Sequence, residues 1–142
     1  MQRKVFRSGP YAELIAQAVQ VDNILYLSGQ VGVDASGAAP DSVVEQTTLA
    51  YEHVKVVLAE FGASLENVVE ETVYVTDIAQ VMNQVQEVFA ARAAAYGGRP
   101  APTLLGYPGH PGGGPIAPRG VRPAPRPGWP EVTNPILFIL LS

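Results

Sequence analysis

The sequence predicts an α+β fold in which a mostly antiparallel sheet has two helices packed on one face. Two observations support this prediction. The expected elements follow the order β-β-β-α-β-α-(β)-β, and tight turns join the first strands, as in antiparallel hairpins. The length of 142 residues suits one domain with one core. We therefore expect residues 1–142 to form a single domain.

Three strands are expected before the first helix. Residues 2–7 predict a short first strand, and residues 16–21 and 24–30 predict a hairpin. Asp22 and Asn23 between them both tolerate positive φ, which a two-residue hairpin turn requires. The hairpin fixes the antiparallel pairing at the start of the sheet.

The first helix is expected over residues 42–61. Ser42 and Glu45 form a capping box, in which the serine accepts from the third helical amide and the glutamate reaches back. Apolar residues then recur at helical spacing as far as Phe61, and Gly62 suits the left-handed position after a helix end.

A second helix is expected from the capping residue Asp77 to the glycine pair Gly97-Gly98. Its inward face, read at unbroken helical spacing, comprises Ile78, Val81, Val85, Phe89 and Arg92. Between the two helices, residues 68–76 are rich in β-branched side chains and predict a strand.

Neither face of the strand at 68–76 is uniformly apolar, because it contains Glu70 and Glu71. Neighbouring residues of a strand point to opposite faces, so these carboxylates are not expected to act as a paired acid and base. Near the end of the sequence, residues 136–141 (ILFILL) predict a short buried strand.

The C-terminal region differs in composition from the rest. Eleven of the 13 prolines lie from Pro100 onward, and proline excludes helix interiors and central strands. We expect residues 99–135 to be a divergent Pro/Gly-rich segment within the domain. Its abrupt onset matches a change of reading frame in a GC-rich gene, either ancient or introduced during cloning, which resequencing of the coding DNA tests.

Composition excludes several classes of function. A net charge of −4 argues against nucleic-acid binding, and the absence of cysteine excludes disulfides, thiolate metal sites and a cysteine nucleophile. His53 and His110 lack partners at metal-ligand spacing, so no metal site is expected. No apolar run approaches a membrane span or a signal-peptide core, so a cytoplasmic protein with no membrane partner is expected.

Several segments together resemble the Rid family, also called YjgF/RidA. The resemblance covers about residues 5–103. Its segments are Gly9-Pro10-Tyr11, Gln17-Ala18-Val19, Leu25-Tyr26-Leu27-Ser28-Gly29-Gln30-Val31-Gly32, Glu45-Gln46-Thr47, the run from Val68 to Asp77, Glu87-Val88-Phe89 and Arg99-Pro100-Ala101.

This resemblance implies a chorismate-mutase-like fold and a homotrimer that binds small molecules in clefts between subunits. It also implies hydrolytic deamination of reactive enamines and imines, such as 2-aminoacrylate, to 2-keto acids and ammonia, with no cofactor or metal. By the same resemblance, the substrate-binding residues are expected to be Ser28, Gly29, Gln30, Tyr11, Gln86 and Thr103.

The chain departs from the family pattern where the substrate carboxylate should be held. The family reads Pro-Ala-Arg-Ser/Thr after the second helix, but here Pro102 stands at the arginine position. The glutamate of a final Val-Glu-Ile-Glu strand is also missing. Arg99 is the remaining candidate for a catalytic cation, although it lies three residues upstream.

Loss of a bidentate Arg–carboxylate contact would lower kcat/KM on the order of 10²–10⁴-fold. The sequence therefore leaves two main alternatives open. One is an active enamine/imine deaminase, and the other is a catalytically impaired member that binds a small metabolite or a protein partner. A third gives the proline- and arginine-rich residues 118–127 a docking role.

Overall fold

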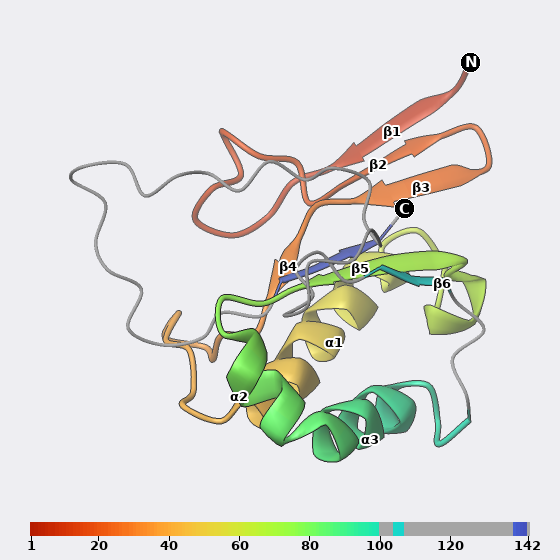
Figure 1. Cartoon of the computed structure of the whole chain (residues 1–142). Coiled ribbons are helices and arrows are strands. Elements are labelled where there is room, and N and C mark those ends of the chain that lie inside the picture. The colour runs from red at the N-terminus through yellow and green to blue at the C-terminus, as the bar shows by residue number, and fades with distance from the viewer. Residues whose placement is uncertain (100–103, 107–137, 142) are drawn as a thin grey trace.

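The computed structural model describes residues 1–99, 104–106 and 138–141, the last two segments by their backbone alone (Figure 1). The expectations for Pro102, Thr103, His110 and residues 118–127 lie outside the described residues.

The described strands form two sheets. The first has the order β1-β2-β3 and is antiparallel throughout. The second has the order β4-β7-β5-β6, with β6 parallel to β5 and the other neighbours antiparallel. The strands are β1 (Arg3–Phe6), β2 (Ala18–Val21), β3 (Ile24–Leu27), β4 (Gln30–Val31), β5 (Glu70–Tyr74), β6 (Leu104–Gly106) and β7 (Phe138–Leu141).

The helices lie together on one face of the second sheet (Figure 1). They are α1 (Val43–Ala59), α2 (Ile78–Asn83) and α3 (Val85–Ala95), with a short 3₁₀ turn, η1 (Leu65–Asn67), between α1 and β5. A mostly antiparallel sheet covered by helices on one face is the predicted α+β class, which is therefore confirmed.

The expected hairpin forms, but its second strand is shorter than predicted. Val21 pairs with Ile24, so the turn has two residues, and Asp22 takes the left-handed conformation with φ 52°. The prediction of one strand over 24–30 is wrong. β3 ends at Leu27 and pairs with β2, whereas β4 begins at Gln30 and pairs with β7 in the other sheet.

The first helix agrees closely with its prediction. The Ser42 hydroxyl accepts from the Glu45 amide at 3.3 Å. At the other end Gly62 has φ 67°, and the amides of Gly62 and Ala63 donate to the carbonyls of Ala59 and Leu58 at 3.0 Å. This is the Schellman arrangement, which satisfies the last helix carbonyls. Tyr51, Val54 and Leu58 of this helix are buried and pack against the sheet.

The second helix is interrupted, contrary to the prediction of a single helix. Asp77 caps α2 as expected, accepting from the Gln80 amide at 3.0 Å, but the helix ends at Asn83 and α3 begins after Gln84. The interruption turns α3 about its axis, so Val88 is buried while Phe89 is 40% exposed. Placing Phe89 on the inward face is therefore wrong, because it assumed unbroken periodicity.

The strand at β5 alternates as the sequence predicts. Glu71 and Val73 are buried on the helix side, whereas Glu70 and Tyr74 are exposed. The predicted C-terminal strand also forms, beginning at Phe138 and lying between β4 and β5.

A close approach of two backbones joins α1 to the end of β4. A Cβ atom at Gly32 would lie 2.2 Å from the carbonyl oxygen of Gln46, in the first turn of the helix. The Gln46 side chain is completely buried and donates to the Pro40 carbonyl. Only glycine lets the chain pass this close to the helix.

Gly32→Ala is expected to lower the free energy of unfolding by roughly 3 kcal/mol, because the added methyl group meets backbone atoms that cannot rotate away. Urea denaturation measures the effect. Gly37→Ala is the control: its Cβ meets nothing within 4 Å, although φ is 83°. The left-handed backbone alone costs about 1 kcal/mol. A loss at Gly32 no greater than at Gly37 would contradict the packing argument.

Candidate functional site

Ser28, Gly29 and Gln30 form a polar corner where the chain passes from β3 into β4. The Ser28 hydroxyl donates to the Ala16 carbonyl at 2.6 Å, and its amide donates to the Gln17 carbonyl at 2.9 Å. These bonds join the corner to the segment that leads into β2. The Ser28 oxygen keeps lone pairs that can accept from a ligand.

Gln30 is 6% exposed and holds the corner together. Its amide nitrogen donates to the Gln17 side-chain oxygen at 3.0 Å and to the Ser28 carbonyl at 2.9 Å. Both of its N–H donors are therefore engaged within the protein. Its contribution to a ligand site would be to position Ser28 and Gly29.

Tyr11 lies on the loop that borders this corner and is 61% exposed. The Ile15 amide donates to the Tyr11 carbonyl at 2.8 Å, and the loop then reaches Ala16, the acceptor of the Ser28 hydroxyl. Arg7 is tied to the same loop by a 2.9 Å bond from Nη1 to the Ala12 carbonyl. Arg7 is thus a cation near the corner that the sequence analysis did not single out.

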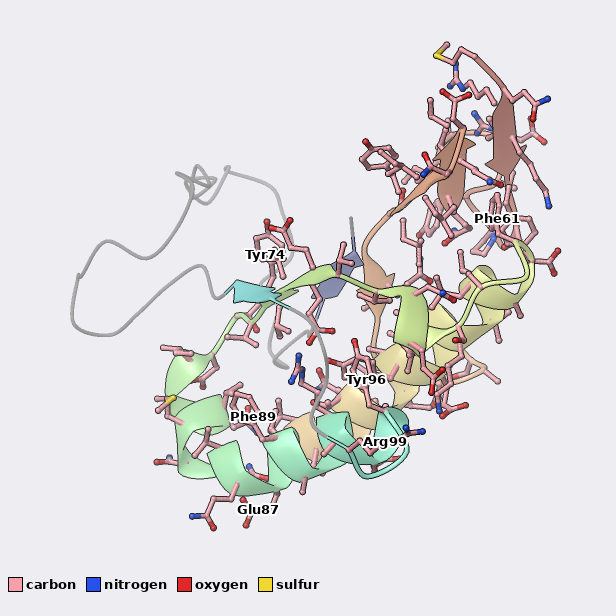
Figure 2. The ribbon with its side chains drawn as sticks, turned by 90° about the vertical axis from the view of Figure 1, so that its right-hand side faces the viewer. Phe61, Tyr74, Glu87, Phe89, Tyr96 and Arg99 are labelled. Atoms are coloured by element: carbon pink, nitrogen blue, oxygen red, sulfur yellow. The ribbon has the colours of Figure 1, made fainter. Side chains whose placement is uncertain are left out.

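Gln86 and Arg99 are not brought together by the structure. Gln86 is exposed at the start of α3, whereas Arg99 follows the end of that 11-residue helix, which is about 16 Å long. Figure 2 shows Arg99 at the opposite end of α3 from Glu87. The Arg99 guanidinium lies 3.3 Å from a Glu66 carboxylate oxygen, and both side chains are 77% exposed. An ion pair this exposed contributes little stability.

A second polar group, which we call the Glu71 cluster, lies buried between the sheet and the helices. The Glu71 carboxylate is completely buried. It accepts from the Tyr51 hydroxyl at 3.1 and 3.2 Å, from the Tyr96 hydroxyl at 3.0 Å, and from Arg92 Nε. The two tyrosine rings pack edge to face at 5.9 Å between centroids.

The cluster joins one strand to two helices. Glu71 belongs to β5, Tyr51 to α1 and Arg92 to α3, with Tyr96 directly after α3. Figure 2 shows Tyr96 on the side of α3 that faces the sheet, while Tyr74 projects from the other face of the sheet. Glu70 and Glu71 are therefore separated by the sheet and do not form an acid–base pair.

Electrostatics keeps the donors of the Glu71 cluster protonated. Burial, together with the nearby carboxylate, strongly raises the pKa of the Tyr51 hydroxyl. Burial acts to lower the pKa of Arg92, but the Glu71 carboxylate outweighs it and raises that pKa overall. Tyr51 and Arg92 thus remain donors while the carboxylate accepts. A carboxylate without exposure cannot meet a substrate, so the cluster has a structural role.

The sequence contains a signal for this cluster. Glu71 shares a strand face with Val73, and Arg92 shares the expected inward helix face with Val81. Opposite charges on two otherwise apolar faces point to a buried pair, because an unpaired charge in a core is very unfavourable. Periodicity alone does not say which elements bring the pair together.

The remaining candidates for metal and membrane binding can be placed within the described residues. There, no group of three His, Cys, Asp or Glu side chains is arranged to hold a metal ion. His53 is half-buried, with Nδ1 2.9 Å from the Val31 carbonyl oxygen. None of the described helices is long and apolar enough to cross a membrane.

Comparison with protein families and sequences gives consistent results. A family model described as Endoribonuclease L-PSP matches residues 7–108. The chain is 42% identical over 72 residues to a 2-iminobutanoate/2-iminopropanoate deaminase of Mus musculus, covering 49% of this chain and 50% of that protein. It is 33% identical over 82 residues to a RutC family protein of Buchnera aphidicola, covering 57% and 60%.

Solved structures share the fold. Yeast Mmf1 matches with a TM-score of 0.65 and 19% identity, covering 99% of this chain and 98% of that one. A member of the YjgF/YER057c/UK114 family from Mycobacterium tuberculosis matches with a TM-score of 0.59 and 23% identity, covering 99% and 100%. By sequence, however, the chain spans only about 50–62% of the length of the first curated relatives it matches.

Glu71→Gln is expected to lower the free energy of unfolding by about 3 kcal/mol, because it removes the counter-charge of Arg92, whose side chain is only 15% exposed. Glu70→Gln makes the same chemical change one residue away on an exposed side chain and is expected to stay within about 0.5 kcal/mol of the natural chain. Thermal and urea denaturation of both variants test this. Equal effects would mean that the buried carboxylate does not anchor the helices.

Alkaline pH is expected to destabilise the fold through Tyr51. Because its pKa is raised in the folded state, its stabilising contribution is complete below pH about 10, the unfolded value, and declines above it. In Tyr51→Phe this dependence is removed. Urea denaturation at several pH values from about 9 to 11 should show a steeper fall for the natural chain than for the variant; parallel curves would contradict the assignment.

Proposed function

Because the chain belongs to the YjgF/RutC/Rid family, we propose that it hydrolyses small reactive enamines and imines. The proposed substrates are 2-imino acids, including the imine formed from 2-aminoacrylate, and the products are 2-keto acids and ammonia. The observation that carries the proposal is the polar corner at Ser28 in a chain of this family. The corner combines a half-buried hydroxyl with an exposed glycine backbone and is held by the buried Gln30 amide.

The proposed reaction requires the protein only to bind the substrate and to orient a water molecule. Water adds to the imine carbon to form a carbinolamine, and this intermediate expels ammonia to leave the keto acid. The atoms balance without an oxidant or reductant. A site accelerates the reaction by holding the substrate and orienting the attacking water. Ser28 and the Gly29 backbone supply neutral polar groups suited to orientation, while the substrate carboxylate requires a cation.

The proposed site has no assigned cation to bind the substrate carboxylate. Pro102 stands at the arginine position of the family pattern, and Arg99 is paired with Glu66 beyond the far end of α3. Arg7 lies closer in the fold to the corner, through its bond to the Tyr11 loop. We therefore include Arg7 with Arg99 as a candidate for carboxylate binding. The second candidate function, a family member that binds a metabolite or protein without catalysis, is favoured by Pro102.

A homotrimer with the ligand clefts between subunits is part of the proposal. The face of the first sheet opposite the helices supports an association of this kind. Val5, Val19 and Tyr26 pair across its three strands, and Val5 and Tyr26 are 40% and 48% exposed. Apolar surface of this kind commonly marks an interface. Light scattering of the native chain tests the assembly, and a monomer would contradict it.

Imine hydrolysis is expected above the spontaneous rate, with Pro102→Arg faster by about 10²-fold in kcat/KM because a charge-assisted contact is restored. An amino-acid oxidase generates the imine in situ, and semicarbazide traps what survives. Ser28→Ala should slow the reaction, whereas Ser36→Ala, in an exposed turn, should not. Arg7→Gln and Arg99→Gln distinguish the two cations.

Inactivity of both the natural chain and Pro102→Arg would overturn the catalytic proposal and favour the binding alternative. Activity in the natural chain that Arg7→Gln abolishes and Arg99→Gln preserves would place carboxylate recognition at the Tyr11 loop. Circular dichroism of every variant separates loss of activity from loss of fold.

A further inference from the structure

Gln17 lies between the two segments of the candidate site. It directly precedes β2 and is half-buried. Before it in the sequence comes the Tyr11 loop (residues 7–15), and its own carbonyl accepts from the Ser28 amide at 2.9 Å. The backbone of Gln17 therefore holds one side of the Ser28 corner. Its side chain extends this connection to the Tyr11 loop.

Two side-chain amides form a continuous chain of hydrogen bonds from the loop to the corner. Gln30 Nε2 donates to the Ser28 carbonyl at 2.9 Å and to Gln17 Oε1 at 3.0 Å. Gln17 Nε2 in turn donates to the Ser8 carbonyl at 3.4 Å. The chain thus joins Ser8, near the start of the Tyr11 loop, to the carbonyl of Ser28.

This chain of bonds has a single consistent direction. A backbone carbonyl stands at each end, and a carbonyl can only accept. Gln30 must therefore turn its NH2 group toward Ser28, and the same group gives its other proton to Gln17. Gln17 must then present its oxygen to Gln30, which leaves its own NH2 group for Ser8. Turning either amide over would place like groups against each other, so each amide fixes the orientation of the other.

Other bonds of the Tyr11 loop fix its shape. The Ile15 amide donates to the Tyr11 carbonyl at 2.8 Å, and Arg7 Nη1 donates to the Ala12 carbonyl at 2.9 Å. These bonds join members of the loop to one another, so they do not set its spacing from the corner. The Gln17 side chain does, because it bonds to both segments.

We propose that Gln17 is a positioning residue that holds the Tyr11 loop and the Ser28 corner at a fixed spacing, so that one small 2-imino or 2-keto acid contacts both. The inference rests on the proposed function, in which Ser28 orients the substrate and Arg7 is a candidate for binding its carboxylate. Oriented binding is sensitive to displacements of about 1 Å, so a loop that moves relative to the corner binds the acid less well. The Gln17 amide itself bonds to the protein and not to the substrate.

Three variants separate the bonds of Gln17. Gln17→Met keeps nearly the same length and removes both side-chain bonds, whereas Gln17→Glu keeps the oxygen that faces Gln30 and loses the donor to Ser8. Gln20→Met is the matched control. Gln20 is also half-buried, and its Nε2 donates to the Asp22 carbonyl at 2.9 Å, within the β2–β3 hairpin.

The first readout is amide hydrogen exchange of the full 142-residue chain without ligand, followed by NMR. Gln17→Met should speed exchange at Ile15 and Ser28 by roughly tenfold, because the loop and the corner open more readily. Gln17→Glu should do so at Ile15 alone, and Gln20→Met at neither. Exchange at the buried Val54 of α1 should stay unchanged in all three variants.

The second readout is binding of 2-oxobutanoate, a 2-keto acid, followed by NMR. In the natural chain the amides of Tyr11 and Gly29 should shift along one saturation curve. Gln17→Met should raise the Kd by about tenfold, and the KM for imine hydrolysis by a similar factor with little change in kcat. Gln20→Met should leave the Kd and the KM unchanged.

Three outcomes would overturn the role of Gln17. They are unchanged exchange at Ile15 in Gln17→Met, an equal rise in exchange at Val54, which would indicate general destabilisation, and a Kd in Gln17→Met equal to that in Gln20→Met. Binding of 2-oxobutanoate at both segments without imine hydrolysis would instead overturn the proposed function and leave the role of Gln17 supported. Absence of binding in the natural chain would overturn both.

Discussion

The buried carboxylate of Glu71 is the constraint on which the described fold depends. A charge removed from water in this way is tolerated only when donors surround it. Here the donors come from two helices: Tyr51 lies on α1, Arg92 lies on α3, and Tyr96 follows the end of α3 directly. The packing of β5 against α1 and α3 therefore depends on these bonds, because without them the carboxylate would be left unpaired in the core.

This constraint explains how α3 is held. The helix is rich in alanine, and Val88 is its one buried residue, so its apolar contact with the rest of the domain is small. The guanidinium of Arg92 and the hydroxyl of Tyr96 donate directional hydrogen bonds to Glu71 where burial of apolar area is limited. α1 is anchored differently, by a long apolar face and by the close backbone contact between Gly32 and Gln46. Hydrogen bonds to a buried carboxylate thus hold α3 in the helical layer, whereas apolar packing and a close backbone contact hold α1 there.

The break between β3 and β4 bears directly on the candidate ligand site. It places Ser28 and Gly29 at a corner between sheets, where a hydroxyl and an exposed backbone can meet a ligand. Pro102 stands at the arginine position of the family pattern, and Arg7 is tied to the loop that borders the corner.

The sequence by itself determined the elements whose signals are local. The Asp22-Asn23 turn, the Ser42 and Asp77 caps and the Gly62 helix end all depend on residues within one turn of each other. The family could also be predicted, because its motifs are short and ordered along the chain. The alternation of Glu70 and Glu71 followed from strand geometry alone.

Only the tertiary structure decided where those elements break and what they meet. The division of the predicted strand at Ser28 and of the predicted helix at Gln84 depends on contacts with elements distant in sequence. The same holds for the Glu71 cluster, whose members lie 20 to 25 residues from the carboxylate. Gln86 and Arg99 are likewise kept apart by the length of α3. Periodicity reports which face of an element is buried, but not which other element covers it.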